Sequence, residues 1–400
     1  MKNLFHIELN HNLIEKMCEW RHFLHSHPEI GLNEKVTSEY IYKVLKEEAK
    51  IDEIYLGYAK TAVVAVIEGN SKNKNSTKQK TIALRADMDA LPLKEKASPL
   101  DKKGMPYKSI YENTMHACAH DIHMASLLGA AKYLNEHKNF FGKVVFIFQP
   151  GEEGFYGAKL MIEEGLLSKI SIDAIFALHI WPDLPYGEWG ITEGSAMANS
   201  DMFTIKIKGY GGHGAFPHKT KDPIITASHL ILALQNIISR MNDPLSPAVL
   251  SITQIHSGTT HNIIPEDVTI TGTLRTLSTE TQNKLIEKIN QIINGVANTF
   301  DSKIELDFHY GYPAMINTPK ETNFCLELVS ELFPDKKIHY PLAASLGGED
   351  FAYFLQKIPG HMIKLGVGGE FALHNPYFVP TDEIMSIVAK YWIGLVEKYN

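Results

Sequence analysis

Short runs of apolar and β-branched residues recur along the first half of the chain, separated by polar or helix-like stretches. The strand-like runs are 61–68, 81–87, 143–149 and 173–180, and residues 124–137 read as an amphipathic helix between the second and third runs. Apolar runs of four to eight residues are typical of buried strands, whereas apolar residues three or four apart are typical of helices. The alternation predicts an α/β fold with a largely buried sheet.

Residues 71–80 (SKNKNSTKQK) interrupt this pattern between two predicted strands, because the segment contains no apolar side chain. Polar runs of this kind are typical of loops. We expect an exposed hairpin tip or loop here. Its basic character is too local to indicate a nucleic-acid site.

A different pattern begins after residue 200, with the order strand, helix, strand, strand, helix, strand. The segments are 202–209, 223–240, 248–256, 267–276, 281–300 and 303–310. This β-α-β-β-α-β order predicts a four-stranded antiparallel sheet with two helices on one face. We expect it to form a domain of residues 183–313, inserted into a discontinuous domain of residues 1–182 and 314–400. A chain of 400 residues is long enough for two hydrophobic cores.

The composition is that of an ordinary globular protein. Hydrophobic residues make up 44% of the chain, charged residues make up 21%, and the formal net charge is −7. Because nucleic-acid-binding proteins usually carry a clustered basic face, we expect a small-molecule partner and neither nucleic acid nor a membrane.

Two features favour a cytoplasmic location. Polar residues interrupt every apolar run near the N-terminus, which argues against a secretory signal, and no uninterrupted apolar stretch reaches about 18 residues. The three cysteines, Cys18, Cys118 and Cys325, are widely spaced and odd in number. A disulfide framework is therefore not expected, which fits a reducing compartment.

Metal-capable side chains are concentrated at the ends of predicted strands, where open α/β sheets bind their ligands. Cys118 and His120 are separated by one residue, so both side chains can point to one side of an extended loop and contact one ion. A thiolate with an imidazole suits zinc, manganese or cobalt better than magnesium. An isolated pair of this kind is more often a buried cysteine beside a surface histidine. Asp121 follows immediately, and we expect it to orient a ligand or to cap the next helix.

Glu152 and Glu153 follow the predicted strand 143–149, and adjacent carboxylates at a strand end are expected to have different surroundings. One of them can bind a metal while the other accepts a proton from water and passes it to a leaving amine. The alternative is a solvated acidic pair at a helix N-terminus. The pair alone does not decide between these interpretations.

With 19 histidines in the chain, only those beside other candidate ligands carry weight. His179 ends a predicted strand, and His374 lies in the segment LHNPYF. In the predicted inserted domain, His213 follows a glycine-rich turn and Asn262 precedes the segment IIP. Arg275 lies on a predicted strand there, and a guanidinium can bind a carboxylate through two hydrogen bonds.

Several short motifs occur in order along the chain: RADMDALP, MHAC-x-HD, EEG, GGHG-x-FP, NIIP, GT-x-RT and EDF. In this order they resemble the M20 family of metallopeptidases and amidohydrolases, particularly the subgroup of hippurate hydrolases, N-acyl-L-amino acid amidohydrolases, auxin-conjugate hydrolases and N-acetyl-diaminopimelate deacetylases. The resemblance runs from about Arg21 to His374. It implies a zinc-peptidase-like catalytic domain, with helices flanking a mixed central sheet, and an inserted ferredoxin-like lid domain that pairs two subunits as a homodimer.

The resemblance also implies a site for two divalent metal ions, with Zn²⁺, Mn²⁺ and Co²⁺ as candidates. The implied roles are metal binding by Cys118, His120, Glu153, His179 and His374; general-base catalysis by Glu152; stabilisation of the reacting oxyanion in a neighbouring active site by His213; substrate binding by Asn262 and Arg275; and support of the site by Asp87, Asp89 and Asp121. The family motif usually has glycines where this chain has Ala119 and Ile122, which add bulk beside the predicted metal loop.

The function implied by these residues is metal-dependent hydrolysis of the amide bond of small N-acyl-L-amino acids, which releases a carboxylic acid and an amino acid. Hippurate-like and N-acetyl amino acids are both possible substrates. A dipeptidase or aminopeptidase of the same family is an alternative, although no acidic residue is evidently reserved for a substrate ammonium group. A non-catalytic metal-binding protein that has kept the fold is a third.

Overall fold

The computed structural model describes residues 7–70, 79–96 and 107–399. Most of the predicted loop at 71–80 therefore lies outside the described residues. The chain divides into two compact units, the first made of residues 1–194, 316–343 and 353–400 and the second of residues 195–315 and 344–352. The strands β7 (Gly194–Met197) and β14 (Met315–Asn317) lie where the chain passes from one unit to the other.

A mixed eight-stranded sheet forms the centre of the first unit, with the strand order β1-β2-β4-β3-β5-β16-β6-β15. Its strands are β1 (Glu53–Leu56), β2 (Val63–Glu68), β3 (Thr81–Asp87), β4 (Lys143–Gln149), β5 (Ala174–Trp181), β6 (Trp189–Gly190), β15 (Ile338–His339) and β16 (Gly360–Gly366). Strands β4, β3, β5 and β16 are parallel to their neighbours in that series. The predicted buried α/β sheet is confirmed.

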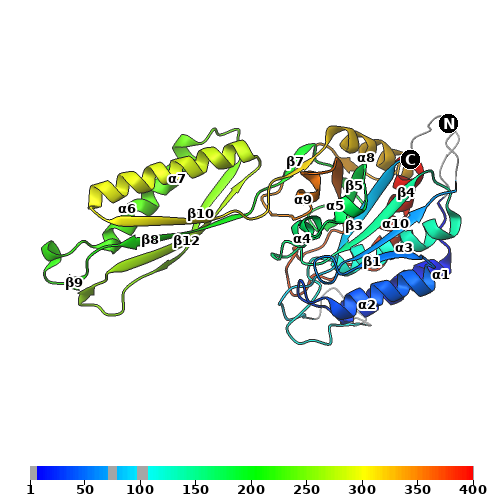
Figure 1. Ribbon diagram of the computed structural model, residues 1–400, viewed down its shortest axis with the longest axis horizontal. Coiled ribbons are helices and arrows are strands. Elements are labelled where there is room, and N and C mark those ends of the chain that lie inside the picture. Colours follow the sequence, from blue (N-terminus) through cyan, green and yellow to red (C-terminus); the bar gives the residue numbers. More distant parts are fainter. Residues whose placement is uncertain (1–6, 71–78, 97–106, 400) are drawn as a thin grey trace. The chain divides into compact units, whose positions relative to one another are not determined.

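Helices flank this sheet (Figure 1). They are α1 (His11–Ser26), α2 (Lys35–Lys43) with the π-helical η1 (Val44–Glu48), α3 (His120–His137), α4 (Gly157–Glu163), α5 (Leu166–Lys169), α8 (Pro319–Leu332), α9 (Ala352–Leu355) and α10 (Ile384–Tyr399). The sequence predicted α3 only from residue 124. Its first turn carries polar side chains that are buried, and this hides the apolar periodicity that marks a helix.

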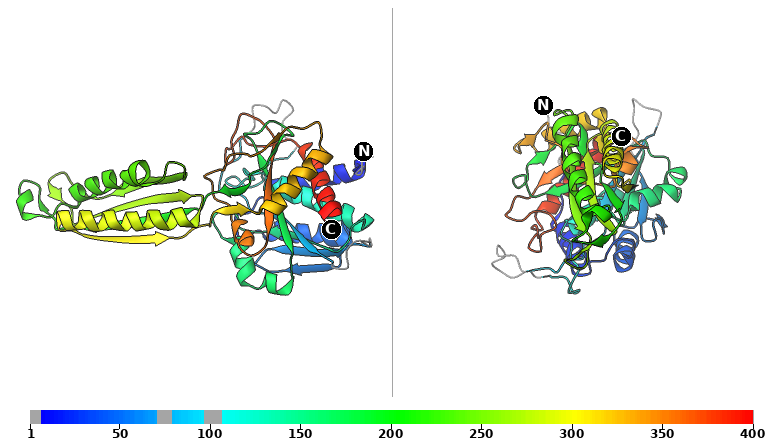
Figure 2. Two further views of the ribbon diagram at one scale, coloured as in Figure 1. Left: turned by 90° about the horizontal axis from the view of Figure 1, so that it is seen from above. Right: turned by 90° about the vertical axis from the view of Figure 1, so that its left-hand side faces the viewer.

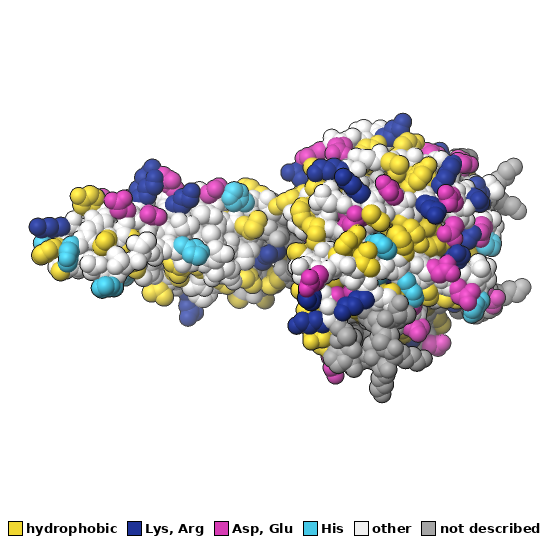
Figure 3. Space-filling view, turned by 90° about the horizontal axis from the view of Figure 1, so that it is seen from below, with side chains coloured by type: hydrophobic (Ala, Val, Ile, Leu, Met, Phe, Trp, Pro, Cys, Tyr) yellow, Lys and Arg dark blue, Asp and Glu magenta, His cyan; other side chains and the backbone are white. Residues whose placement is uncertain are grey.

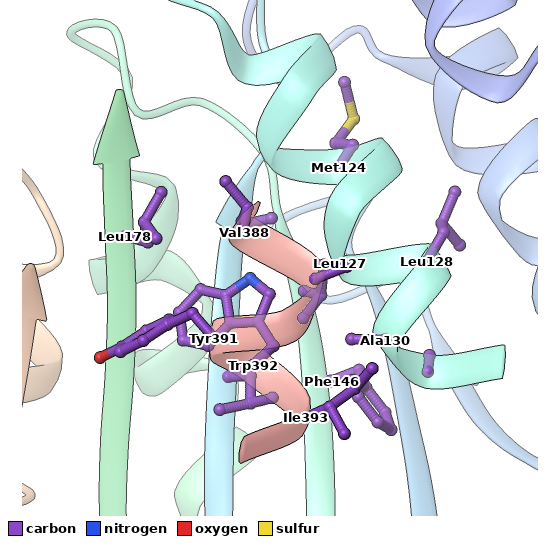
Figure 4. Packing of buried hydrophobic residues seen from close by; sticks show 14 of the residues in the cluster. Met124, Leu127, Leu128, Ala130, Phe146, Leu178, Val388, Tyr391, Trp392 and Ile393 are labelled. Carbon is purple, nitrogen blue, oxygen red and sulfur yellow. The ribbon is translucent and has the colours of Figure 1, made fainter. Parts of the chain in front are cut away.

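The core of the first unit lies between the sheet and the pair α3 and α10. Leu127 of α3 lies beside Trp392 of α10, Leu128 lies on the opposite side of α3, and Phe146 of β4 lies near Ile393 (Figure 4). Small residues let α3 approach its neighbours closely. A side chain at Gly129 would place its Cβ 2.3 Å from the sulfur of Met17 on α1, so α1 and α3 can pack at this distance only with glycine there.

The second unit contains the predicted β-α-β-β-α-β arrangement, with α6 and α7 on one face of a four-stranded antiparallel sheet (Figures 1 and 2). Its strand order is β10-β12-β8-β13. The elements are β8 (Asp201–Lys208), β9 (Gly212–His213), η2 (Pro217–Lys219), α6 (Pro223–Asn236), η3 (Ile237–Met241), β10 (Ala248–His256), β11 (Ile263–Ile264), β12 (Asp267–Thr276), α7 (Thr279–Phe300) and β13 (Lys303–His309).

Local sequence signals explain where the two helices of this unit begin. Asp222 accepts hydrogen bonds from the first turn of α6, and Pro223 occupies its first position. Ser278 caps α7 by accepting from the backbone N–H of Thr281. Such caps satisfy backbone donors that have no partner inside the helix. Along β8, buried and more exposed residues alternate, as expected for a sheet covered on one face only.

Among the described residues, the segment Pro223–Met241 is long and apolar enough to cross a membrane by length and composition alone, and 28% of it is buried. The sequence pattern did not single it out because polar residues interrupt its apolar runs. Thr226, Leu230 and Leu234 face the sheet of the second unit, so part of its apolar character serves that core.

Candidate metal centre and active site

The carboxyl ends of β3, β4 and β5 bring the candidate residues of the first unit together. Asp87 ends β3, Glu152 and Glu153 follow β4, and His179 lies near the end of β5. Because the carboxyl ends of parallel strands meet at one edge of a sheet, side chains that are far apart in sequence become neighbours. Cys118 and the first turn of α3 lie at the same edge.

Cys118, His120 and His179 form one buried group whose potential ligand atoms all lie within 4.8 Å of one another. The Sγ atom of Cys118 lies 3.5 Å from Nε2 of His179, and the rings of His120 and His179 meet edge to face with centroids 6.1 Å apart. Burial raises the pKa of the Cys118 thiol well above its usual value, and the nearby Glu153 and Glu152 carboxylates raise it further. A positive charge placed here would have the opposite effect.

A second group contains Cys118, Glu153 and His374, again with ligand atoms within 4.8 Å of one another. Nε2 of His374 lies 3.0 Å from Oε1 of Glu153. The backbone of His374 is left-handed, with φ of 64°, and its N–H donates to the carbonyl of Ala117 at 2.8 Å. The shared cysteine makes the two groups adjacent, as a pair of bridged ions requires.

The donor set fits divalent cations. Nδ1 of His120 lies 2.8 Å from the backbone carbonyl of Asp89, which leaves Nε2 of His120 as the free ring nitrogen. Among the described residues, that Nε2 is buried without a hydrogen-bond partner. A thiol, imidazoles and a carboxylate are the ligands that zinc and its neighbours in the first transition row accept. The residues present can therefore hold such ions.

Asp87 lies at the base of this site and organises it. Its Oδ2 accepts a hydrogen bond from Nη1 of Arg85 at 2.7 Å, and its Oδ1 lies 2.6 Å from Nδ1 of His123. The N–H of Ile180, beside His179, donates to Nε2 of His123 at 3.1 Å. Burial raises the pKa of Asp87, but the neighbouring basic groups outweigh it and hold the pKa well below its usual value. Asp87 thus ties β3 to α3 and to the backbone of β5.

Two carboxylates hold the turn that carries Glu152 and Glu153. Asp89 Oδ2 accepts from the N–H of Glu153 at 2.8 Å, and Glu34 Oε1 accepts from the N–H of Gly151 at 2.9 Å. Glu34 also accepts from the Thr61 hydroxyl at 2.7 Å, and its burial raises its pKa to about 7. Sequence analysis missed Glu34 because it lies 117 positions from Gly151 and carries no motif.

Asp121 does not cap α3. The N-cap position is Ala119, which has a left-handed backbone with φ of 65° and makes no side-chain cap. Asp121 instead accepts from Nε of Arg21 at 2.9 Å and lies 3.0 Å from Nδ1 of His25. Arg21 also donates to Asp382 at 2.6 Å. This buried network joins α1 to the first turn of α3.

The remaining candidates lie in the second unit. His213 on β9 pairs with Ile263 on β11, and the carbonyl of Asn262 accepts from the N–H of Gly214 at 2.8 Å, so His213 and Asn262 lie close together. Both are exposed. Arg275 on β12 is half-buried, and its Nε donates to Thr273 Oγ1 at 3.1 Å.

Comparison with known proteins agrees with this geometry. The model of the peptidase family M20/M25/M40 matches residues 83–398. The chain belongs to this family. It is 41% identical to a hippurate hydrolase of Campylobacter jejuni over 95% of both chains, and 40% identical to an N-acetyl-L-cysteine deacetylase of Bacillus subtilis over 93% of this chain and 85% of that one.

A solved structure also resembles this M20 chain. It is a Bacillus subtilis protein described as a dinuclear metal-binding peptidase of the M20 family, with a TM-score of 0.83 and 34% identity. The match covers 97% of this chain and 98% of that one. The predicted family membership is thereby confirmed.

The buried ion pair between Arg21 and Asp121 generates a test of stability. Asp121→Ala should lower the free energy of unfolding by about 3–5 kcal/mol, because it leaves the buried guanidinium of Arg21 without this carboxylate. Chemical denaturation followed by circular dichroism measures the change. Asp52→Ala is the matched control, since it removes an exposed partner of Lys46 and should cause no measurable change. Equal stability of the two variants would contradict a structural role for the buried pair.

Proposed function

We propose that this chain is an amidohydrolase that hydrolyses small N-acyl-L-amino acids with two divalent metal ions. The observation that carries the proposal is the grouping of Cys118, His120, Glu153, His179 and His374 beside a second carboxylate, Glu152. Cys118, His120 and His179 are buried in it, whereas His374 lies at its exposed edge. The names of its relatives point to the same substrate class, as both a hippurate hydrolase and a deacetylase of an N-acetyl amino acid cleave an amide of an acylated amino acid.

Each residue has a distinct task in this proposal. When bound, the ions would supply Lewis acidity, which polarises the scissile carbonyl and lowers the pKa of water so that it can lose a proton and attack. Glu152 accepts the proton of the attacking water and then donates it to the leaving nitrogen, so the amide C–N bond breaks with the amine neutral. Asp89 keeps the imidazole of His120 in place through its backbone carbonyl and the turn of Glu153 through its carboxylate. Asp87 supports the site by binding the neighbouring His123.

The second unit supplies the substrate contacts in this proposal. Arg275 takes the free carboxylate of the amino acid, because a guanidinium matches carboxylate geometry. His213 stabilises the reacting oxyanion in the active site of a neighbouring subunit, and Asn262 contacts the substrate. Their exposure leaves them available to a ligand.

A dipeptidase or aminopeptidase is the second candidate within the same chemistry, and it differs in requiring recognition of a substrate ammonium group. A non-catalytic protein is the third. The experiment that separates them is amino-acid release from a panel of N-acetyl, N-benzoyl and dipeptide substrates, by protein treated with chelator and then supplied with Mn²⁺, Zn²⁺ or Co²⁺. We expect release from the N-acyl substrates to stop on chelation and to return with metal. Preference for dipeptides, or no release with any metal, would refute the proposal.

The role of Glu152 can be tested separately from metal binding. Glu152→Gln should lower kcat by about 10²–10⁴-fold, because general acid–base catalysis contributes that much. Elemental analysis should still find the wild-type amount of metal, since this residue is not a proposed ligand. Glu163→Gln, an exposed change on the nearby helix α4, serves as the control and should keep full activity. Near-normal turnover of Glu152→Gln would assign the base to another residue.

We further propose that the chain forms a homodimer through the second unit. Its helix α6 and the segment after it leave five large apolar side chains exposed: Ile224, Ile225, Leu232, Met241 and Leu245. Several large apolar side chains exposed along one helix and the segment after it are typical of an interaction site. A second copy of the chain can cover these side chains, because two identical apolar surfaces can pack against each other across a twofold axis.

Leu232 is 69% exposed and is the residue to change. Leu232→Asp should convert a dimer into a monomer, because it places a charge in an apolar interface. Sedimentation velocity measures the mass. Leu56→Asp alters a residue that is 53% exposed in the first unit and should leave the dimer intact. A wild-type protein that sediments as a monomer would refute the proposed interface.

A cytoplasmic location is also part of the proposal. Cys18, Cys118 and Cys325 are all free thiols in the structure, as expected where disulfides do not persist. Figure 3 shows basic and acidic side chains interspersed over the visible face of the first unit. Such a mixed surface offers no broad attraction for polyanions, so we keep a small molecule as the expected partner.

A further inference from the structure

Lys364 is a buried lysine beside the proposed metal centre, and the proposed mechanism gives it no role. Lys364 lies on β16, directly opposite His179 of the neighbouring parallel strand β5. Side chains of paired residues point to the same face of a sheet, so Lys364 shares the face on which His179 approaches Cys118. Only 3% of Lys364 is exposed.

The ammonium group of Lys364 has no close anionic partner. Among the described residues, none forms an ion pair or a hydrogen bond with its Nζ, and the Asp183 carboxylate acts on it only from a greater distance. Its Nζ lies over the indole ring of Trp181, 3.5 Å from the ring centroid. That indole meets the His179 ring edge-on with centroids 5.9 Å apart. Trp181 therefore contacts both Lys364 and His179, a proposed metal ligand.

A structural role alone does not explain this arrangement. Buried lysines usually extend an apolar stem and bring the charged end to water, or they pair with a carboxylate. The indole face attracts a cation but replaces only part of its hydration. Burial accordingly lowers the pKa of Lys364 to about 8, against the smaller opposing effect of Asp183. An anion supplied by a ligand would complete the site.

We propose that Lys364, held over Trp181, is a specificity-determining residue that binds a second carboxylate of the substrate, in addition to the α-carboxylate assigned to Arg275. The inference rests on the proposed amidohydrolase function. Within the class of N-acyl amino acids, Lys364 would favour substrates that carry two carboxylates. The second carboxylate can belong to a dicarboxylic acyl group or to the amino-acid side chain, since both ends of the substrate extend from the scissile bond.

Binding of the products tests the inference without turnover. Metal-loaded protein is titrated calorimetrically with two pairs of matched compounds: succinate against butanoate for the acyl end, and L-glutamate against L-glutamine for the amino-acid end. We expect the more anionic member of one pair to bind at least tenfold more tightly, and that pair identifies the end which Lys364 contacts. Lys364→Met, which keeps the length of the stem, should remove the preference, and Lys364→Arg should retain most of it.

Turnover provides the second measurement, with N-succinylglycine against N-butanoylglycine and N-acetyl-L-glutamate against N-acetyl-L-glutamine. We expect Lys364→Met to reduce kcat/KM at least tenfold for the favoured dianionic substrate and to leave kcat/KM for its monoanionic counterpart within about twofold. An equal loss for both members of a pair would overturn the inference, because it would indicate a general role such as packing. So would a preference that is identical in the wild type and Lys364→Met.

The two proposals fail in distinguishable ways. Absence of metal-dependent release from every N-acyl compound refutes the amidohydrolase function, whereas release without any charge preference refutes only the role of Lys364. Thermal unfolding of Lys364→Met checks that the variant is folded. If the methionine variant is unstable, Lys364→Gln replaces it in both comparisons, with the same expected loss of the preference.

Discussion

The requirement that buried charges be compensated governs this structure. Asp87 is fully buried, and the basic groups of His120, Arg85 and His123 around it favour its charged form. Arg85 and His123 bind its two oxygens. The bond to His123 joins β3 to α3, and the bond from Ile180 to His123 joins β5 to both. Removing the charge from Asp87 would release three elements at once. The positions of the proposed ligands follow from this anchoring, since Cys118, His120 and His179 lie immediately beside the anchored residues.

Left-handed backbone conformations occur at this site as well as elsewhere in the fold. Ala119, Tyr156 and His374 all have left-handed backbones, a conformation that is uncommon for residues other than glycine and asparagine. Ala119 stands between Cys118 and His120 and lets the chain turn sharply into α3, so that both side chains reach one buried space. His374 turns back to donate to Ala117. Such strain persists only where surrounding contacts over-determine the conformation, and it is typical of functional sites.

Sequence patterns predicted the elements better than the contacts between them. The buried strands β3 and β4 and the β-α-β-β-α-β order were evident because apolar periodicity is a local property. Local signals also grouped Cys118 with His120 and Glu152 with Glu153. They did not decide whether these side chains bind metal or are simply buried or solvated. Only the resemblance to a family favoured metal binding.

Long-range partners could not be predicted in the same way. Glu34 holds the turn of Gly151 from 117 positions away, and Arg21 reaches Asp121 across 100 positions. Single polar residues on helical segments carry no periodic signal. Asp121 illustrates the difficulty, because its position at the start of a helix favoured a cap, while the buried guanidinium of Arg21 was the stronger partner for its charge.

Arg21 and Lys364 show why a buried cation is informative when its surroundings are known. Arg21 is completely buried, yet Asp121, Asp382 and the carbonyl of Pro380 satisfy its guanidinium, so its place in the fold is explained without a ligand. Lys364 is nearly as buried, but it has no close anionic partner: the face of Trp181 and the more distant Asp183 carboxylate are what stabilise its charge. Both residues belong to the same unit, and burial disfavours the charge of each. A buried charge without a close anionic partner, one strand away from a proposed metal ligand, is therefore better explained by a partner that arrives with the substrate than by packing.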